Sequence, residues 1–139
     1  MDKRTILKLT NEELRIKAAE LDNYTDFEFD EDGEVWGTRP TWEGLHAELP
    51  NYPTNIGTAM RDLFESVYGP GGKIKDGAWV LGTVHNGRDC AHACLMWKDT
   101  GFEKRRQLKV EVDCPRGEMA RAITLCWVCA MLGVSDTEV

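Results

Sequence analysis

Long apolar runs are missing from the sequence. No hydrophobic stretch approaches the roughly 20 residues that a helix needs to cross a bilayer. The polar start Met1-Asp2-Lys3-Arg4 also lacks the apolar stretch of a signal peptide. We therefore expect a cytoplasmic protein without a membrane partner.

The sequence also lacks an even number of cysteines in a regular disulfide framework, and it lacks an excess of positive charge. Its five cysteines follow no regular spacing, so in a reducing compartment they are expected to be free thiols. The net charge of −7 disfavours direct binding to the phosphates of DNA or RNA, which requires clustered Lys and Arg. The same charge permits binding to a basic surface on another protein.

Motifs for phosphate and calcium are incomplete. The glycine-rich residues 69–73 lack the preceding strand and the Lys-Ser/Thr pair of a phosphate-binding loop. The acidic run at residues 28–33 resembles the start of a calcium loop, but Arg39 stands where a bidentate Glu is required. We expect no cofactor and no bound metal.

What is present is enough apolar material for a core. The hydrophobic fraction is 42%, with five Trp, four Phe and three Tyr among 139 residues. A chain of this size suits a single domain over residues 1–139. Helical and strand-like patterns both occur along it, which predicts a mixed α+β class.

Two helices are predicted in the first half of the chain. Residues 10–22 begin with Thr10 and Glu13, which have the spacing of a capping box. Residues 55–67 carry an apolar residue at every third or fourth position from Ile56 onward. This second pattern predicts a surface helix with one buried stripe.

A third helix is predicted at the end of the chain. Asp113 or Cys114 is the candidate cap, Pro115 lies in the first turn, and Gly133 is the candidate C-terminal stop. Residues 125–132 are apolar nearly all round, which indicates a helix that is buried on every side.

The longer of two predicted hairpins occupies residues 78–97. Asn86-Gly87 is the preferred pair for a two-residue type I′ turn, which pairs His85 with Arg88. Residues 90–97 are apolar on both faces, so we expect this strand to lie buried in the middle of the sheet.

The remaining strand-like segments are shorter. Residues 27–36 predict a hairpin that turns at Asp32-Gly33, and residues 108–113 alternate as a strand near an edge of the sheet. Residues 37–53 are rich in glycine and proline, and we interpret them as a loop across the surface.

Cysteine and histidine gather in the segment HNGRDCAHAC at residues 85–94. A zinc site here would use Cys90, His92, Cys94 and Cys114. In an extended strand, however, Cys90 and Cys94 are about 13 Å apart, which is too far to share one ion. The favoured interpretation is that the cysteines fill the core and that the histidine is hydrogen-bonded or half-exposed on the sheet. The alternative is a cysteine nucleophile with a histidine base.

A partner-binding surface is predicted at the acidic hairpin and the loop that follows it. Six carboxylates fall within the nine positions 26–34, and exposed Trp beside charge is a common anchor of protein interfaces. The predicted surface consists of Asp26, Glu28, Asp30, Asp32, Trp36 and Trp42.

Several stretches of the sequence resemble the phage ABA-sandwich domain family of small bacteriophage and prophage proteins. They are LTNEELRIKAAEL, LPNYPTNIGTAMRDLFES, the strand led by Trp79, and ARAITLCWVCAMLG. The resemblance covers residues 10–134 and rests on packing and capping motifs. It implies an α/β/α sandwich, with a small antiparallel meander of three to four strands packed with three helices. It also implies a phage protein of the host cytoplasm and supplies no catalytic residue.

Together these features predict a non-enzymatic bacteriophage accessory protein that binds a host or phage protein with a basic surface. Inhibition of a host antiviral defence is one concrete form of this activity. The alternative is a small-molecule-binding module or a hydrolase that uses the Cys/His strand at residues 85–94. Self-association as a homo-oligomer is compatible with either.

Overall fold

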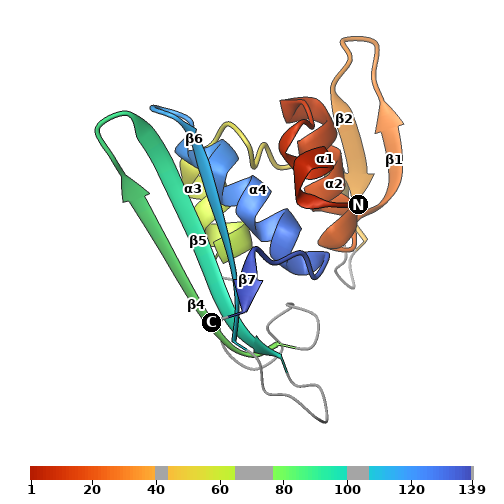
Figure 1. The fold of residues 1–139 in the computed structure, drawn as a ribbon. Coiled ribbons are helices and arrows are strands. Elements are labelled where there is room, and N and C mark those ends of the chain that lie inside the picture. The colour runs from red at the N-terminus through yellow and green to blue at the C-terminus, as the bar shows by residue number, and fades with distance from the viewer. Residues whose placement is uncertain (40–43, 65–76, 100–106, 139) are drawn as a thin grey trace.

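Two antiparallel sheets lie on either side of a layer of helices (Figure 1). The computed structural model describes residues 1–39, 44–64, 77–99 and 107–138. The predicted mixed α+β class is confirmed, as is the antiparallel meander of three to four strands. In the described residues the helices form the middle layer, so the layer order is β/α/β where the resemblance implied α/β/α.

Both sheets follow the order of the chain. One sheet consists of β1 (Thr25–Phe29), β2 (Val35–Thr38) and β3 (His46–Glu48). The other consists of β4 (Gly77–Asn86), β5 (Cys90–Asp99), β6 (Gln107–Pro115) and β7 (Thr137–Glu138). The helices between them are α1 (Lys3–Leu7), α2 (Asn11–Leu21), α3 (Ile56–Thr58), the π-helix η1 (Ala59–Phe64) and α4 (Met119–Met131).

Helix α2 begins with the predicted capping box. The Thr10 hydroxyl accepts the backbone N–H of Glu13 (3.1 Å), and the Glu13 carboxylate accepts the N–H of Thr10 (3.0 Å). Two of the N–H groups that a helix start leaves unpaired are therefore satisfied. Asn23 follows the helix with a φ of 67°, a conformation that Asn tolerates better than most residues.

Up to residue 64 the predicted helix at residues 55–67 is only partly correct, and residues 65–67 lie outside the described residues. Asn55 caps it by accepting the Thr58 N–H (3.0 Å). From Ala59 onward the chain is a π-helix, and Ile56 is 52% exposed while Leu63 is buried. Ile56 precedes the π-helix, whereas Ala59 and Leu63 within it are buried as the apolar stripe predicts.

The prediction of a surface loop over residues 37–53 is wrong. Strand β3 pairs with β2, and the chain then enters the core, where Leu49 and Tyr52 are buried. Arg15 of helix α2 donates to the carbonyl oxygens of Leu49 and Pro50. These bonds pair carbonyl groups that lie next to buried side chains, which lets an irregular segment pass under the sheet.

The predicted start of the last helix is also wrong. Strand β6 continues through Pro115, because Cys114 pairs with Ala91 and Pro115 with Cys90. The chain then turns through Gly117, whose φ is 91°, and α4 begins at Met119. Cys114 and Pro115, which the sequence predicts at the start of the helix, therefore belong to strand β6.

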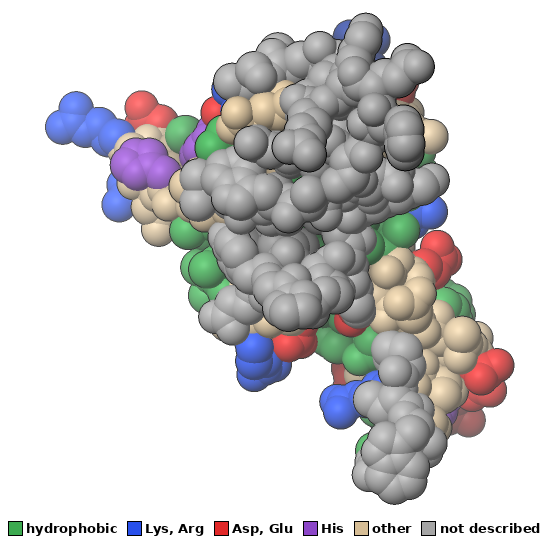
Figure 2. Space-filling model, turned by 90° about the horizontal axis from the view of Figure 1, so that it is seen from below, with side chains coloured by type: hydrophobic (Ala, Val, Ile, Leu, Met, Phe, Trp, Pro, Cys, Tyr) green, Lys and Arg blue, Asp and Glu red, His purple; other side chains and the backbone are tan. Residues whose placement is uncertain are grey.

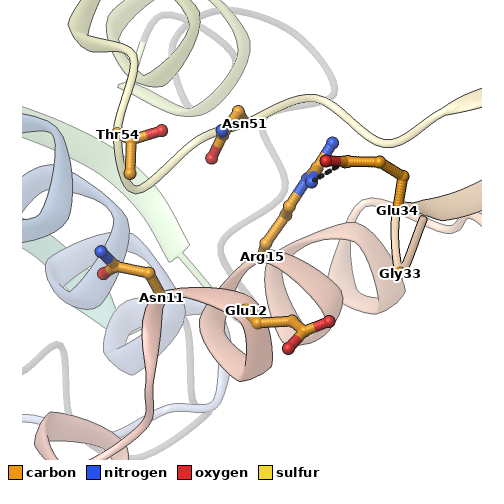
Figure 3. Close-up of a pocket in the computed structure, with 7 residues that line it drawn as sticks. All are labelled: Asn11, Glu12, Arg15, Gly33, Glu34, Asn51 and Thr54. Atoms are coloured by element: carbon orange, nitrogen blue, oxygen red, sulfur yellow. Dashed lines mark hydrogen bonds and ion pairs between the residues drawn. The ribbon is translucent and has the colours of Figure 1, made fainter.

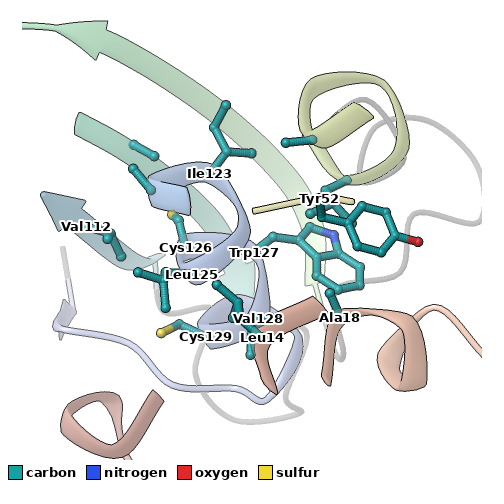
Figure 4. Close-up of a cluster of buried hydrophobic side chains, with 14 of the residues drawn as sticks. Leu14, Ala18, Tyr52, Val112, Ile123, Leu125, Cys126, Trp127, Val128 and Cys129 are labelled. Atoms are coloured by element: carbon teal, nitrogen blue, oxygen red, sulfur yellow. The ribbon is translucent and has the colours of Figure 1, made fainter. Parts of the chain in front are cut away.

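Helix α4 is buried as predicted. Eleven of its thirteen residues are buried, and it packs against β5, β6, η1, α1 and α2 (Figure 4). It ends as expected at Gly133, whose φ is 74°. The Gly133 N–H donates to the Ala130 carbonyl and the Val134 N–H to the Cys129 carbonyl, the two bonds of a Schellman motif.

The β4–β5 hairpin has a different register from the predicted one. His85 pairs with His92 rather than with Arg88, and residues 87–89 lie between the strands. Asn86 and Gly87 are not among the described residues with positive φ, so they do not form a type I′ turn. The shift from 88 to 92 is an even number of residues, and the same side chains therefore still share each face.

Strand β5 lies between β4 and β6, which confirms its predicted central place. Its two faces are not buried equally. On the side of α4 the side chains of Ala91, Ala93, Leu95 and Trp97 are at most 2% exposed. On the outer side Cys94 is buried, whereas Cys90, His92 and Met96 are half-buried, so the prediction of burial on both faces holds fully only for the inner face.

Trp127 provides a test of how α4 is packed. Its indole is fully buried beside Tyr52 (Figure 4), and its Nε1–H has no hydrogen-bond partner in the described part of the chain. We expect Trp127→Ala to lower the free energy of unfolding by about 3–5 kcal/mol, because it leaves a large cavity. We expect Trp127→Phe to cost clearly less, because the ring is kept and an unpaired donor is removed.

Denaturant unfolding of the two variants and the wild type measures this difference. An equal loss of free energy of unfolding in the Phe and Ala variants would contradict this prediction. It would indicate that the indole N–H is satisfied and stabilises the fold.

Candidate functional site

The acidic hairpin lies at one end of the molecule, away from the β4–β5 turn. Figure 2 shows Asp and Glu side chains along the side that carries β1 and β2, and His and Lys or Arg side chains at the end that carries the β4–β5 turn. The hairpin carboxylates are all exposed: Asp26, Glu28, Asp30, Glu31, Asp32 and Glu34. No residue of β1 is fully buried. Strand β1 is therefore a surface strand, whereas β2 contributes Val35 to the core.

Asp30 holds the hairpin turn together. Its carboxylate accepts the backbone N–H groups of Asp32 and Glu34, both at 2.9 Å, and the indole N–H of Trp36 at 3.0 Å. The bond from Trp36, followed by those from the backbone, holds the pKa of the Asp30 carboxyl below its ordinary value. Asp30 is thus a structural residue of the turn as well as a surface charge.

Trp36 is fixed on the outer face of the three-stranded sheet. Besides its bond to Asp30, its ring stacks on His46 with centroids 6.1 Å apart and planes 21° apart. Glu28 and Glu48 lie opposite Trp36 on the neighbouring strands, and Glu28 is 3.4 Å from the His46 ring nitrogen Nε2. The predicted anchor is half-buried and preordered, with acids on both sides. Trp42 lies outside the described residues.

Two features of β1 were not foreseen. Asp26 has a φ of 55° and lies where the β1–β2 register shifts between Thr25 and Glu28. Phe29, at the tip end of β1, is 64% exposed and adjoins both Glu28 and Asp30. The sequence signal that could have indicated this exposed ring was the position of Phe29, two residues after Phe27 in a strand where acids alternate with the aromatic residues. The hairpin therefore combines charge with an exposed aromatic ring.

A shallow groove separates the hairpin from the start of helix α2 (Figure 3). Its volume is about 220 Å³, below the roughly 300–1,000 Å³ of typical small-molecule sites. The groove is lined by Asn11, Glu12, Arg15, Gly33, Glu34, Asn51 and Thr54.

Arg15 is the central cation of this groove. Its guanidinium lies 3.3 Å from Glu34 and 3.5 Å from Glu48, in addition to its bonds to backbone carbonyls. Its side chain is only 12% exposed. With its donors directed at protein groups, Arg15 ties the hairpin to α2 and offers little to an anionic ligand.

The Cys/His strand places its polar residues on the outer face of the larger sheet. His92 Nδ1 lies 2.7 Å from the Asp113 carboxylate, and its Nε2 lies 3.6 Å from Glu111. Cys94 pairs with Thr83 on one side and with Glu111 on the other. The histidine is thus held by two carboxylates of the adjacent strand, on a face where it is only half-buried. This agrees with the prediction of a hydrogen-bonded or half-exposed histidine on the sheet.

The four residues of the zinc alternative do not come together. Cys90, His92 and Cys94 share the outer face, while Cys114 pairs with Ala91 and lies on the inner face. Within the described ranges no group of three or more metal-ligating side chains is close enough to hold an ion.

The nucleophile alternative gains no support from the thiols. Burial raises the pKa of Cys94 and of Cys114, which lowers the fraction of reactive thiolate at neutral pH. The Cys90 sulfur lies 3.9 Å from the Asp113 carboxylate.

Comparison with family models, with curated proteins and with solved structures finds no match to this chain. None of the helices in the described residues is both long and apolar enough to cross a membrane.

The role of Asp30 predicts a pH titration of Trp36. Because the folded-state pKa of Asp30 is lowered, its bond to the indole persists as pH falls below 3.8, the ordinary value for Asp, and is lost only on further acidification. The indole N–H resonance of Trp36 should therefore shift with a midpoint below 3.8 in a pH series followed by NMR. The Asp30→Asn variant removes the titrating group, while Asp32→Asn serves as the matched control. A titration that survives in Asp30→Asn would contradict the assignment.

The buried thiols of α4 predict a loss of stability in alkali. Burial raises the pKa of Cys129 to about 11 and that of Cys126 well above its ordinary value of 9.0. Above about pH 9 the unfolded chain releases thiol protons that the folded chain keeps, so the free energy of unfolding falls as pH rises toward 11. Each thiol contributes at most about 1.4 kcal/mol per pH unit.

Denaturant unfolding between pH 8 and pH 11 measures this slope. Cys129→Ala should lower stability at pH 8 but flatten the slope relative to the wild type. An unchanged slope in that variant would show that Cys129 ionises equally in both states.

Proposed function

We propose that this chain is a non-enzymatic accessory protein that binds a basic surface of another protein through its β1–β2 hairpin. The observation that carries the proposal is the exposed Phe29 ring on the same hairpin as a group of exposed carboxylates. Glu31 and Asp32 form no ion pair with any described residue, and Phe29 is 64% exposed. Aromatic side chains flanked by charge supply both contact area and selectivity in protein interfaces.

The order of the hairpin supports the same proposal. Asp30 fixes the turn and the Trp36 indole, and Arg15 ties the base of the hairpin to α2. A surface that is already ordered loses less conformational entropy when a partner docks. The hairpin therefore presents its acids in one arrangement before any partner arrives.

The nature of the partner follows from charge and from the sequence resemblance. The chain carries −7 overall, and the hairpin concentrates that charge, so the partner surface is basic. The phage origin of the chain and a host or phage protein as partner rest on the resemblance to the phage ABA-sandwich family. Inhibition of a host defence protein is the concrete form we propose.

Charge reversal at the hairpin tip tests this function. The double variant Glu31→Lys, Asp32→Lys changes two exposed carboxylates without touching Asp30, so the turn is kept. We expect it to weaken retention of the partner from a bacterial host lysate at least about tenfold, because close charge pairs across an interface contribute on the order of 1.5 kcal/mol or more. Quantitative mass spectrometry of the retained proteins measures the effect.

The matched control is Asp89→Lys, Glu118→Lys. Both residues are exposed, and the change in net charge is the same, but they lie outside the hairpin. The control should retain the partner like the wild type. A photoreactive residue in place of Phe29 should crosslink the same partner, whereas one in place of the exposed Ile56 should not. Equal retention by both double variants would reject the hairpin as the binding surface.

A further inference from the structure

The outer face of the three-stranded sheet carries an aromatic ring between two acids. On the central strand β2, Trp36 lies directly opposite Glu28 of β1 and Glu48 of β3. Side chains of directly paired residues stand on the same face of a sheet, and neighbouring strands are roughly 5 Å apart. The two carboxylates therefore flank the indole. Val35 and Gly37, its neighbours along β2, are buried on the other face.

In the part of the chain that the structure describes, no helix or strand covers this face. The described helices lie on the inner side of the sheet (Figure 1). The side chain of Glu28 is 73% exposed and that of Glu48 is 51% exposed, while Trp36 between them is half-buried. The indole and both carboxylates can therefore be reached from solvent without any change in the fold.

The indole is fixed in place, and part of its ring face is free. Asp30 accepts the indole N–H (3.0 Å), so the only polar group of the Trp36 side chain is already paired. His46 stacks on the ring with centroids 6.1 Å apart, near the far end of the range of about 4.5–7 Å for offset aromatic pairs, so it covers the indole only in part. The same imidazole lies 3.4 Å from Glu28. A flat, nitrogen-bearing ring of the chain itself thus makes the two contacts, to an indole and to a carboxylate, that a bound guanidinium would make.

Negative charge is in excess on this face. Glu28 contacts His46, Glu48 contacts Arg15, and Asp30 adds a third carboxylate. The Arg15 guanidinium also donates to backbone carbonyls and lies 3.5 Å from Glu48, so this carboxylate can accept further donors. A basic side chain is therefore the complement of this face. Arginine fits it better than lysine, because its planar guanidinium stacks on aromatic rings and donates to carboxylates in a fixed fork, whereas the lysine ammonium is a compact, strongly hydrated charge.

We propose that the outer face of the three-stranded sheet is the docking site for an arginine side chain of the partner protein. The guanidinium lies over the free part of the Trp36 indole, and its donors are directed at Glu28 and Glu48. This inference rests on the proposed function, because it names the residue type through which the basic partner is bound. It also extends the binding surface from the β1–β2 hairpin to β3, which supplies Glu48.

Titration of the protein with the neutral-ended peptide acetyl-Gly-Arg-Gly-amide, followed by NMR, tests the proposal. The indole N–H resonance of Trp36 should shift and saturate as the peptide binds. Acetyl-Gly-Lys-Gly-amide should bind at least about threefold more weakly, because it has the same charge but loses the stacking of a guanidinium on the indole. Absence of a saturable shift, or equal binding of the two peptides, overturns the proposal.

The variant Glu28→Gln locates the site. Because Glu28 is largely exposed, the change should leave the fold intact, and it should weaken binding of the arginine peptide at least about threefold. Glu118→Gln is the matched control, because it makes the same chemical change at an exposed position outside this sheet, and it should bind like the wild type. Equal binding by the two variants overturns the proposal.

The proposed function is tested separately by the hairpin-tip variant Glu31→Lys, Asp32→Lys, which leaves Trp36, Glu28 and Glu48 in place. If the peptide titration fails while this variant still loses its partner from the lysate, the arginine site is rejected and the binding function of the hairpin stands. If the tip variant keeps its partner, the hairpin function is rejected whatever the peptide does.

Discussion

Burial of helix α4 on every side is the constraint on which the rest of the structure depends. A helix that is apolar all round is stable only with partners all round. Strands β5 and β6 cover one side, and α1, α2 and η1 cover the others. Because α4 and its helical neighbours occupy the middle layer, the two sheets lie apart. The three-stranded sheet therefore keeps an outer face toward solvent, and the acidic hairpin is a consequence of that arrangement.

A few polar contacts join the two ends of the chain around this core. Arg121 of α4 donates to the Asn11 side chain (2.7 Å) and to the Leu9 carbonyl (2.6 Å), which fixes the start of α2. The Lys3 ammonium donates to the Glu111 carbonyl (2.7 Å) and pairs with Asp136. The first helix is thereby attached to the segment that covers the β6 edge. These bonds can form in only one arrangement of the apolar surfaces. They therefore make the fold more specific than burial of apolar surface alone would.

Features that depend on local chemistry could be predicted from the sequence. The capping box of Thr10 and Glu13, the stop at Gly133 and the all-round burial of α4 are each encoded within a few residues. The strand faces of the β4–β5 hairpin were also predicted, although the register was not. Side-chain direction alternates with a period of two, so an even shift moves the pairs without exchanging the faces.

Features decided by competition between elements could not be predicted in this way. Cys114 and Pro115 carry the signals of a helix start, but pairing with β5 extends the strand through them. Tyr52 and Leu49 lie in a segment rich in glycine and proline, yet they enter the core, because α2 offers Arg15 to bind the neighbouring carbonyls. In both cases the local propensity is opposed by a partner that lies far away in the sequence.

The partner-binding surface stays a prediction, and the structure shows only which roles its residues have within the fold. Charge density identified the hairpin, because exposed carboxylates are visible in the sequence. The sequence could not show that the Asp30 carboxylate accepts hydrogen bonds from the turn and from Trp36. It also could not show that the Phe29 ring is more exposed than the Trp36 ring. No residue of β1 is fully buried, so the tip of the hairpin contributes little to the apolar core. Substitutions there are therefore expected to leave the domain folded, whereas substitutions of the buried Cys126, Cys129 or Trp127 of α4 are expected to destabilise it.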